Sequence, residues 1–562
     1  MRGRWADAVW LLVFGLASSA WCLTAATRLG ATFDEPLYVK AGLVNWRTGS
    51  NKLLMRAGTM PLPVDVQTLP AYLWERHRGQ PFDPVADLDT VLPVCRAANL
   101  VFWWLLLVYT MRLGRTFGGA WGGRLAVALV ACDPNLLGHA ALATTDIALL
   151  ASMMVFIYHF HHNYQPDAGW TRRVLFPGVL YGLALATKAS AMAFVPQAML
   201  VLGLWSLARA GVLTPPAGSS LREKGVHLWH ATYQLRKDIF VIGLIGFITV
   251  FVYCGSDWGT EPTFIKWADG LPEGDLKRVM TPVSRDLKIF TNAGEGLLHQ
   301  IKHNFRGHGT YLLGRWYDRA TPAYFPLALS MKVPLPAIVL LLAALVVHPR
   351  RLLLPTAGVA LILFAFLPNC RVQIGIRFVF TLMVLTYITA AAAVARGWAD
   401  QRTGASARVV PRALVGALLA ALVATAAWVW PNGLSYFNQA WGGSETGRFL
   451  LHDSNYDWGQ GVPELRAWND AHNDGRPLSV WYFGSDPAVS RPPLEAVHLS
   501  VLPLRSADDA VTYCPTKYLA VSVSHFSNNP APFPQHKARL EWARGQTPVA
   551  RTTYFLIYQL RD

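Results

Sequence analysis

Apolar residues fall into blocks that are close to the length of a membrane-spanning helix, with short polar connections between them. A helix needs about 20 mostly apolar residues to cross the hydrocarbon core of a bilayer. On this basis the sequence predicts a polytopic α-helical membrane protein. About eleven spans are expected, at 8–27, 98–111, 125–141, 146–160, 174–187, 189–208, 238–254, 326–347, 352–367, 377–395 and 413–430.

The charged residues between the blocks predict the orientation of the chain. If the N-terminus is inside, every inside connection is basic, with arginines or lysines within 2–4, 112–124, 172–173, 209–237, 350–351 and 396–412. Short cytoplasmic connections carry an excess of Lys and Arg, so this orientation is favoured. An odd number of spans then places the C-terminus outside.

Three segments on the expected outer side are long. Residues 28–97 and 255–325 form outer loops of a transmembrane domain that covers residues 1–430. Residues 431–562 form a tail that is too large for a linker. Its aromatic and β-branched runs at 477–483, 517–523 and 553–558 predict strands separated by Pro, Asn and Asp turns. We therefore expect a small extracytoplasmic α/β domain.

Composition supports a membrane protein and excludes two other classes. The chain is 53% hydrophobic and 15% charged, whereas soluble domains carry about 25% charged residues. The net charge of +16 does not indicate nucleic-acid binding, because the basic residues lie between apolar blocks and no nucleic-acid motif is present. Six scattered cysteines without a CxxC pair predict neither a zinc site nor a disulfide framework.

Two adjacent carboxylates follow the first predicted span. Asp34 and Glu35 lie between aromatic residues just outside the membrane, where a carboxylate is costly unless it is paired or functional. A carboxylate in this position can take a proton from an acceptor hydroxyl. A solvated loop pair or a helix N-cap explains the same residues equally well.

Two further polar residues are expected at the same membrane edge. Asp146 begins the fourth apolar block, with His139 shortly before it as a possible hydrogen-bond partner. Asp and Thr are favoured at helix starts, so Asp146 with Thr144 and Thr145 also fits a simple helix cap.

Basic residues on the expected outer side are candidates for binding a phosphate. Lys188 lies between two apolar runs, where it either meets a lipid phosphate at a helix break or extends to the interface. Arg377 opens the tenth span on the side that the charge rule disfavours for arginine, and guanidinium suits bidentate phosphate binding. Arg315 is a weaker candidate of the same kind.

In these motifs the chain resembles the polytopic glycosyltransferases with a GT-C fold. It looks most like the dolichyl- or polyprenyl-phosphate-mannose protein mannosyltransferase group (glycosyltransferase family 39) and its bacterial members. The matching segments are the Asp34-Glu35 pair and residues 134–146, 182–188, 309–315, 324–332, 375–377, 434–439 and 453–460. Each motif is weak alone, and their order along one chain makes the combination more specific.

The resemblance implies transfer of a sugar from a polyprenyl-phosphate donor on the outer membrane face, with inversion. Asp34 is then the base, with Glu35 and Asp146 in support, and Lys188, Arg377 and Arg315 bind the donor phosphate. The sequence indicates no definite cofactor, and a divalent metal is possible. The resemblance to bacterial members favours the plasma (inner) membrane. The acceptor is a protein, or alternatively a lipid or polysaccharide, because the tail differs from that of the eukaryotic members.

Two classes of function other than an enzyme, a secondary transporter and a non-catalytic scaffold, are alternatives. Intramembrane ionisable residues also mark the pathways of secondary transporters, which often have repeated halves. No repeat is visible here, and the candidate residues gather at one predicted face. A non-catalytic scaffold would tolerate the loss of Asp34, Asp146 and Lys188 together.

Overall fold

The computed structural model describes residues 2–165, 167–404, 408–497, 507–527 and 541–561, and it is mostly helical. Five helices are long and apolar enough to cross a membrane, or six if one bent pair counts as a single span. They lie at Trp5–Ala26, Leu88–Ala131, Ala191–Arg209, Leu221–Cys254 and Ile376–Arg402. The chain is therefore a multi-pass membrane protein.

Each of the eleven predicted apolar blocks contains helix, but several blocks are not straight spans. The bundle consists of α1 (Arg2–Ala26), α5 (Leu88–Ala131), α6 (Pro134–Ala140), α7 (Asp146–Asn163), α8 (Phe176–Thr187), α9 (Ala191–Arg209), α11 (Tyr233–Cys254), α15 (Tyr324–Lys332), α16 (Leu335–Val347), α17 (Pro355–Phe366), α18 (Phe380–Arg402) and α19 (Arg412–Trp428). The helices α17 and α19, with 12 and 17 residues, are shorter than a typical span.

The long helix α5 turns back on itself at Gly119. This residue has φ +66° and ψ −162°, which interrupts the helix in a backbone region that favours glycine. After the turn the chain packs against its own preceding part, since the space for a Cβ on Gly114 is taken by Gly122 and Gly123. The Gly119 turn falls in the connection predicted between the spans at 98–111 and 125–141. The span predicted at 125–141 is itself divided, at Cys132 and Asp133, between the end of α5 and the separate helix α6.

The span predicted at 326–347 is broken in two. Helices α15 and α16 meet at an angle of 108°. Val333 and Pro334 between them are extended. A proline has no N–H to donate and disfavours helical backbone in the residue before it, which explains the break.

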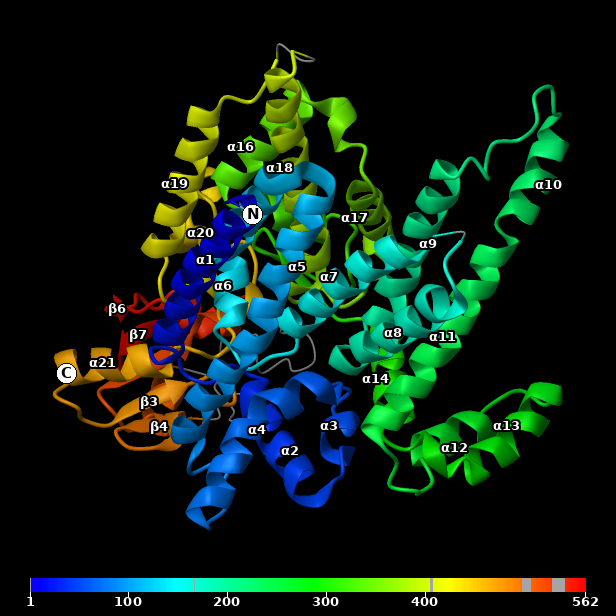
Figure 1. The fold of residues 1–562 in the computed structure, drawn as a ribbon. Coiled ribbons are helices and arrows are strands. Elements are labelled where there is room, and N and C mark those ends of the chain that lie inside the picture. The colour runs from blue at the N-terminus through cyan, green and yellow to red at the C-terminus, as the bar shows by residue number, and fades with distance from the viewer. Residues whose placement is uncertain (1, 166, 405–407, 498–506, 528–540, 562) are drawn as a thin grey trace.

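The connections predicted to lie inside gather at one end of the bundle. Asp7 of α1 forms ion pairs with both Arg115 and Arg124, on either side of the Gly119 turn. Trp121 in the same turn packs edge-on against Trp398 near the end of α18. In Figure 1 the N-terminus lies in the upper half of the view, and the C-terminus lies lower, beside α21 (Val462–His472).

The two predicted outer loops are themselves helical. Residues 28–97 contain α2 (Glu35–Thr48), α3 (Lys52–Arg56), α4 (Pro61–Arg78) and the start of α5. Residues 255–325 contain α12 (Pro262–Asp269), α13 (Asp275–Asp286), α14 (Ala293–Arg306) and the hairpin of β1 (Thr310–Leu312) and β2 (Arg315–Tyr317). A further helix, α10 (Leu221–Ala231), projects at the other end of the bundle (Figure 1).

The tail forms a mixed sheet of five strands in the order β4-β3-β5-β7-β6. The three predicted runs contain β3 (Leu478–Trp481), β5 (Tyr518–Ser522) and β7 (Phe555–Gln559), and the edges are β4 (Leu494–Ala496) and β6 (Ala550–Arg551). β3 is parallel to β4 and β5, while β7 is antiparallel to β5 and β6. The helices of this part are α20 (Ser444–Gly447), α21 (Val462–His472) and α22 (Ala507–Tyr513).

The segment between α19 and the sheet packs into the helical part. Leu434 and Trp458 form one buried cluster with Leu29 and Leu142 of the bundle. The buried ammonium of Lys332 donates hydrogen bonds to the carbonyls of Leu434 and Asn455, at 2.6 and 2.7 Å. Residues 434–458 therefore belong structurally to the helical end, and the sheet follows them.

Candidate active site

Four charged side chains from distant parts of the sequence meet at one end of the bundle. Asp34 immediately precedes α2, and Asp146 is the first residue of α7. Lys188 lies in extended backbone at the break between α8 and α9, and Arg377 lies in the short 3-10 turn before α18. Each stands at the end of a helix, which brings the charge to the edge of the apolar bundle.

Asp146 is held by two cations. Its Oδ1 is 2.5 Å from Nζ of Lys188, and its Oδ2 is 3.7 Å from Nη1 of Arg377. The same Nη1 is 3.6 Å from Oδ2 of Asp34. Two carboxylates and two cations thus form one cluster with no net charge. The side chain of Asp146 is 1% exposed and that of Asp34 is 30% exposed, so Asp34 is the carboxylate that a substrate can reach.

Arg377 is buried, yet its hydrogen-bonding groups are unused. The side chain is 8% exposed, and its Nε is buried without a hydrogen-bond partner among the described residues. The contacts with Asp34 and Asp146 are too long for hydrogen bonds. The guanidinium lies over the ring of Trp458, 4.1 Å from its centroid. Burying an unsatisfied charged donor is costly, so this arrangement points to a ligand that accepts hydrogen bonds.

Asp34 occupies the N-cap position of α2 without acting as a cap. Its side chain makes no capping hydrogen bond, so the helix-cap explanation of this residue does not hold. Burial raises the pKa of the Asp34 carboxyl above its ordinary value, while Arg377 opposes that shift. A carboxylate with a raised pKa is a stronger base than an ordinary aspartate.

His139 lies beside this cluster in α6. Its Nδ1 is 3.7 Å from Oδ2 of Asp146, beyond hydrogen-bond distance, and the side chain is 1% exposed. The ring packs edge-on against Phe380 and is tilted against Trp458. It therefore forms part of the wall behind Asp146 rather than a surface open to a substrate.

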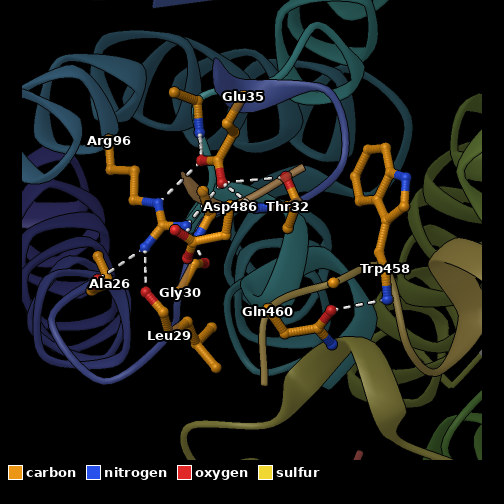
Figure 2. Close-up of polar contacts among 12 residues, drawn as sticks. Ala26, Leu29, Gly30, Thr32, Glu35, Arg96, Trp458, Gln460 and Asp486 are labelled. Carbon is orange, nitrogen blue, oxygen red and sulfur yellow. Dashed lines mark hydrogen bonds and ion pairs between the residues drawn. The ribbon is translucent and has the colours of Figure 1, made fainter. Parts of the chain in front are cut away.

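Glu35 belongs to a hydrogen-bond network around Arg96, shown in Figure 2. Its two oxygens accept hydrogen bonds from Arg96, from the backbone and hydroxyl of Thr32, and from the backbone N–H of Ala143. Arg96 also donates to the carbonyls of Ala26, Leu29 and Gly30. Glu35 has no oxygen left for a substrate. It supports Asp34 by fixing the loop between α1 and α2.

The tail holds the other side of the same loop. The N–H groups of Gly30 and Phe33 donate to the carbonyls of Gln460 and Trp458, at 2.9 and 2.8 Å. The N–H of Ala31 donates to Oδ2 of Asp486 at 2.8 Å. The backbone just before Asp34 is thereby tied to the tail.

Three contributors were not among the predicted site residues. Arg96 could have been found by the rule that selected Arg377, because it is an arginine on the predicted outer side. Trp458 and Asp453 lie in the 453–460 motif, but nothing in the motif indicates which side chains meet Arg377. Asp453 has φ +57°, and burial raises its pKa to about 6 while Arg377 opposes the shift.

Arg315 does not join the cluster. It is exposed on the hairpin strand β2, paired with Leu312. Its neighbour Trp316 packs against His452, which places the hairpin near the 453–460 segment. Among the described residues, no group of three or more His, Cys, Asp or Glu side chains is arranged to hold a metal ion.

Comparison with known proteins gives no close relative. No family model matches the sequence, and no curated protein matches it. Among solved structures, ArnT from Cupriavidus metallidurans bound to undecaprenyl phosphate is 14% identical, with a TM-score of 0.45 and 98% of both chains covered. The oligosaccharyltransferase AglB from Archaeoglobus fulgidus, in complex with an inhibitory peptide and a dolichol-phosphate, is 11% identical, with a TM-score of 0.43. That alignment covers 99% of this chain and 75% of AglB. Likenesses at this level carry no inference about the donor or acceptor of this chain.

Proposed function

We propose that this chain is a GT-C-like glycosyltransferase that transfers a monosaccharide from a polyprenyl-phosphate donor to an acceptor hydroxyl, with inversion. The observation that carries the proposal is the buried Arg377 guanidinium with an unpartnered Nε, beside Lys188 and within 4 Å of Asp34. A side chain that can bind phosphate and a carboxylate that can act as a base thus lie together at the end of a membrane bundle.

The donor phosphate is assigned to Arg377 and Lys188. A planar guanidinium binds phosphate oxygens through paired hydrogen bonds, and an ammonium adds a compact positive charge. Nζ of Lys188 donates to Asp146, and an ammonium has two further protons to donate. As the bond between the sugar C1 and the phosphate oxygen breaks, the electron pair leaves with the phosphate, and both cations stabilise the added charge.

Asp34 is assigned as the base. Its carboxylate takes the proton of the acceptor hydroxyl while that oxygen forms the new bond to C1, on the face opposite the leaving phosphate. Displacement from the opposite face inverts the configuration at C1. The raised pKa of Asp34 suits this role, and Arg377 keeps the carboxylate oriented before the donor binds.

The remaining predicted residues are assigned to positioning. Asp146 holds Lys188 and Arg377 in place through its two oxygens, and His139 packs behind it. Glu35 fixes the Asp34 loop through Arg96. The proposal includes a location in the plasma (inner) membrane, with the tail outside, and an acceptor that is a protein or a glycan or lipid.

The test is a transfer assay with purified protein in nanodiscs. A panel of radiolabelled polyprenyl-phosphate monosaccharides is offered with protein, glycan and lipid acceptors, and release of the sugar is measured. The anomeric configuration of the product is then determined by NMR. Turnover with inversion supports the proposal. Retention of configuration would exclude a single direct displacement at C1. Absence of turnover by folded protein across the panel would favour a transporter.

A further inference from the structure

A cavity lies where the end of α19 meets the tail, and Arg377 is not among its lining residues. It has a volume of about 330 Å³ and is lined by residues that include Trp430, Glu445, Arg448, Tyr456, Glu464 and Arg551. Trp430 follows the apolar helix α19 by two residues, and tryptophan favours the membrane–water interface. The cavity is thus placed at the edge of the membrane.

One buried acceptor in this cavity has no donor. Oε1 of Glu464 accepts hydrogen bonds from the backbone and hydroxyl of Thr553, both at 2.9 Å. Its Oε2 is buried and has no hydrogen-bond partner among the described residues. A buried carboxylate oxygen without a donor is costly, so a group that donates a hydrogen bond is expected there.

One cation in the same cavity has unused donors. Arg551 is paired with Glu445 at 3.1 Å. The side chain of Arg448, in contrast, makes no hydrogen bond or ion pair with any residue that the structure describes, and its guanidinium lies over the ring of Phe449. A guanidinium has five N–H donors. A group that accepts hydrogen bonds is therefore expected beside Arg448.

The two vacant partners together favour a ligand that both donates and accepts hydrogen bonds. An ionised phosphate alone would satisfy Arg448 but offers no donor to Glu464, and an ammonium alone would satisfy Glu464 but offers no acceptor to Arg448. A hydroxyl both donates and accepts, so the hydroxyls of one saccharide can serve both residues. The rings of Trp430 and Tyr456 add apolar walls beside these polar groups, as in other small-molecule pockets. We propose that this cavity is a saccharide-binding site, distinct from the Asp34 cluster.

The two sites share one segment of the chain. Tyr456 lines the cavity, whereas Trp458, two residues later, lies against Arg377. Two residues span at most about 7 Å. The sites are nevertheless distinct, because none of the four charged residues of the cluster lines the cavity. The proposal does not rest on the transferase activity, and a protein without that activity would still bind the saccharide.

The experiment uses saturation-transfer difference NMR with the full chain in phosphatidylcholine nanodiscs. The probes are methyl and octyl glycosides of glucose, mannose, galactose and N-acetylglucosamine, with inorganic phosphate as a further probe. Glu464→Gln keeps an oxygen for Thr553 and places an NH₂ donor where Oε2 was. Arg448→Gln removes the guanidinium. The matched control is Glu495→Gln, which changes an exposed carboxylate on β4 of the same domain.

Wild type is expected to bind at least one glycoside, and both cavity variants to lose affinity at least about tenfold, because each removes a hydrogen bond to a charged group. Glu495→Gln is expected to bind as wild type does. Binding of octyl glycosides alone assigns the site to a membrane-anchored glycolipid, and binding of both series assigns it to a free saccharide. Binding of phosphate alone, of no glycoside, or of equal strength in the folded cavity variants overturns the proposal.

Discussion

Nη1 of Arg377 lies 3.6 Å from the carboxylate of Asp34, close enough to attract it and too far to form a hydrogen bond. The arginine thus orients the carboxylate while its own donors stay available. This relationship joins the binding of the donor phosphate to the activation of the acceptor in the proposed reaction.

Arg377→Gln should weaken binding of the polyprenyl phosphate at least tenfold, since hydrogen bonds between charged groups are among the strongest in proteins. Arg377→Lys should recover part of the affinity, because an ammonium keeps the charge but not the paired geometry. Binding of radiolabelled undecaprenyl phosphate measures the effect. Arg315→Gln is the control, because Arg315 is exposed on β2. A larger loss of affinity in Arg315→Gln than in Arg377→Gln would mean that Arg315, rather than Arg377, is the main arginine that binds the donor phosphate.

The pH dependence of the reaction should report on Asp34. A base must be ionised, so kcat/KM should fall as the pH drops through the pKa of Asp34 in the free enzyme. Burial raises that pKa above the ordinary aspartate value of 3.8, so the fall should be centred at a higher pH than 3.8. Rates measured in nanodiscs across the acidic range test this. A profile that stays flat down to pH 3.8 would contradict a raised pKa at the base.

Glu35→Gln should destabilise the protein rather than remove a reacting group. It leaves Arg96 buried, at 1% exposure, with an incomplete set of partners. Removing one partner of a buried ion pair typically costs about 3–5 kcal/mol. The apparent Tm should therefore fall well below that of wild type. Asp34→Asn leaves the buried Arg377 with Asp146 as its second carboxylate, and so should lower the Tm less than Glu35→Gln. The opposite order would mean that Glu35 is not the anchor of the loop.

Much of the site could be predicted from the sequence, because its members stand where apolar blocks end. Asp34, Asp146, Lys188 and Arg377 are ionisable residues at such boundaries, and the charge rule placed them on one side. The pairing of Glu35 with Arg96 could not be predicted, because two adjacent carboxylates at one boundary look alike in the sequence. Only the direction of the loop decides which of them faces the cluster.

The fold departs from the predicted spans where single residues redirect the backbone. Pro134 and Pro334 each mark a break in what hydropathy treats as continuous apolar sequence, since hydropathy measures length and not backbone geometry. Three strands of the tail could be predicted, because each lies in a run of aromatic and β-branched residues. The packing of residues 434–458 into the bundle depends on contacts such as that of Lys332 with the Asn455 carbonyl, and no local pattern predicts them.

Asp453→Asn should stabilise the protein in a pH-dependent way. Burial raises the folded-state pKa of Asp453 from 3.8 to about 6, so ionisation disfavours the folded state. This cost is absent below pH 3.8, grows between the two pKa values, and is complete above about pH 6. It is at most about 3 kcal/mol for a shift of this size. The Tm difference between variant and wild type should therefore be larger at pH 7 than at pH 4. A difference that is independent of pH would contradict the raised pKa.

The central claim is that Asp34 is the base of a sugar transfer from a lipid phosphate. The most direct measurement compares sugar release from a radiolabelled polyprenyl-phosphate monosaccharide by wild type, Asp34→Asn and the control Asp275→Asn, whose carboxylate is exposed on α13. We expect turnover by wild type and by the control, and a loss of about 10²–10⁴-fold in Asp34→Asn, with undecaprenyl phosphate still bound. Turnover by Asp34→Asn at the wild-type rate would contradict the account.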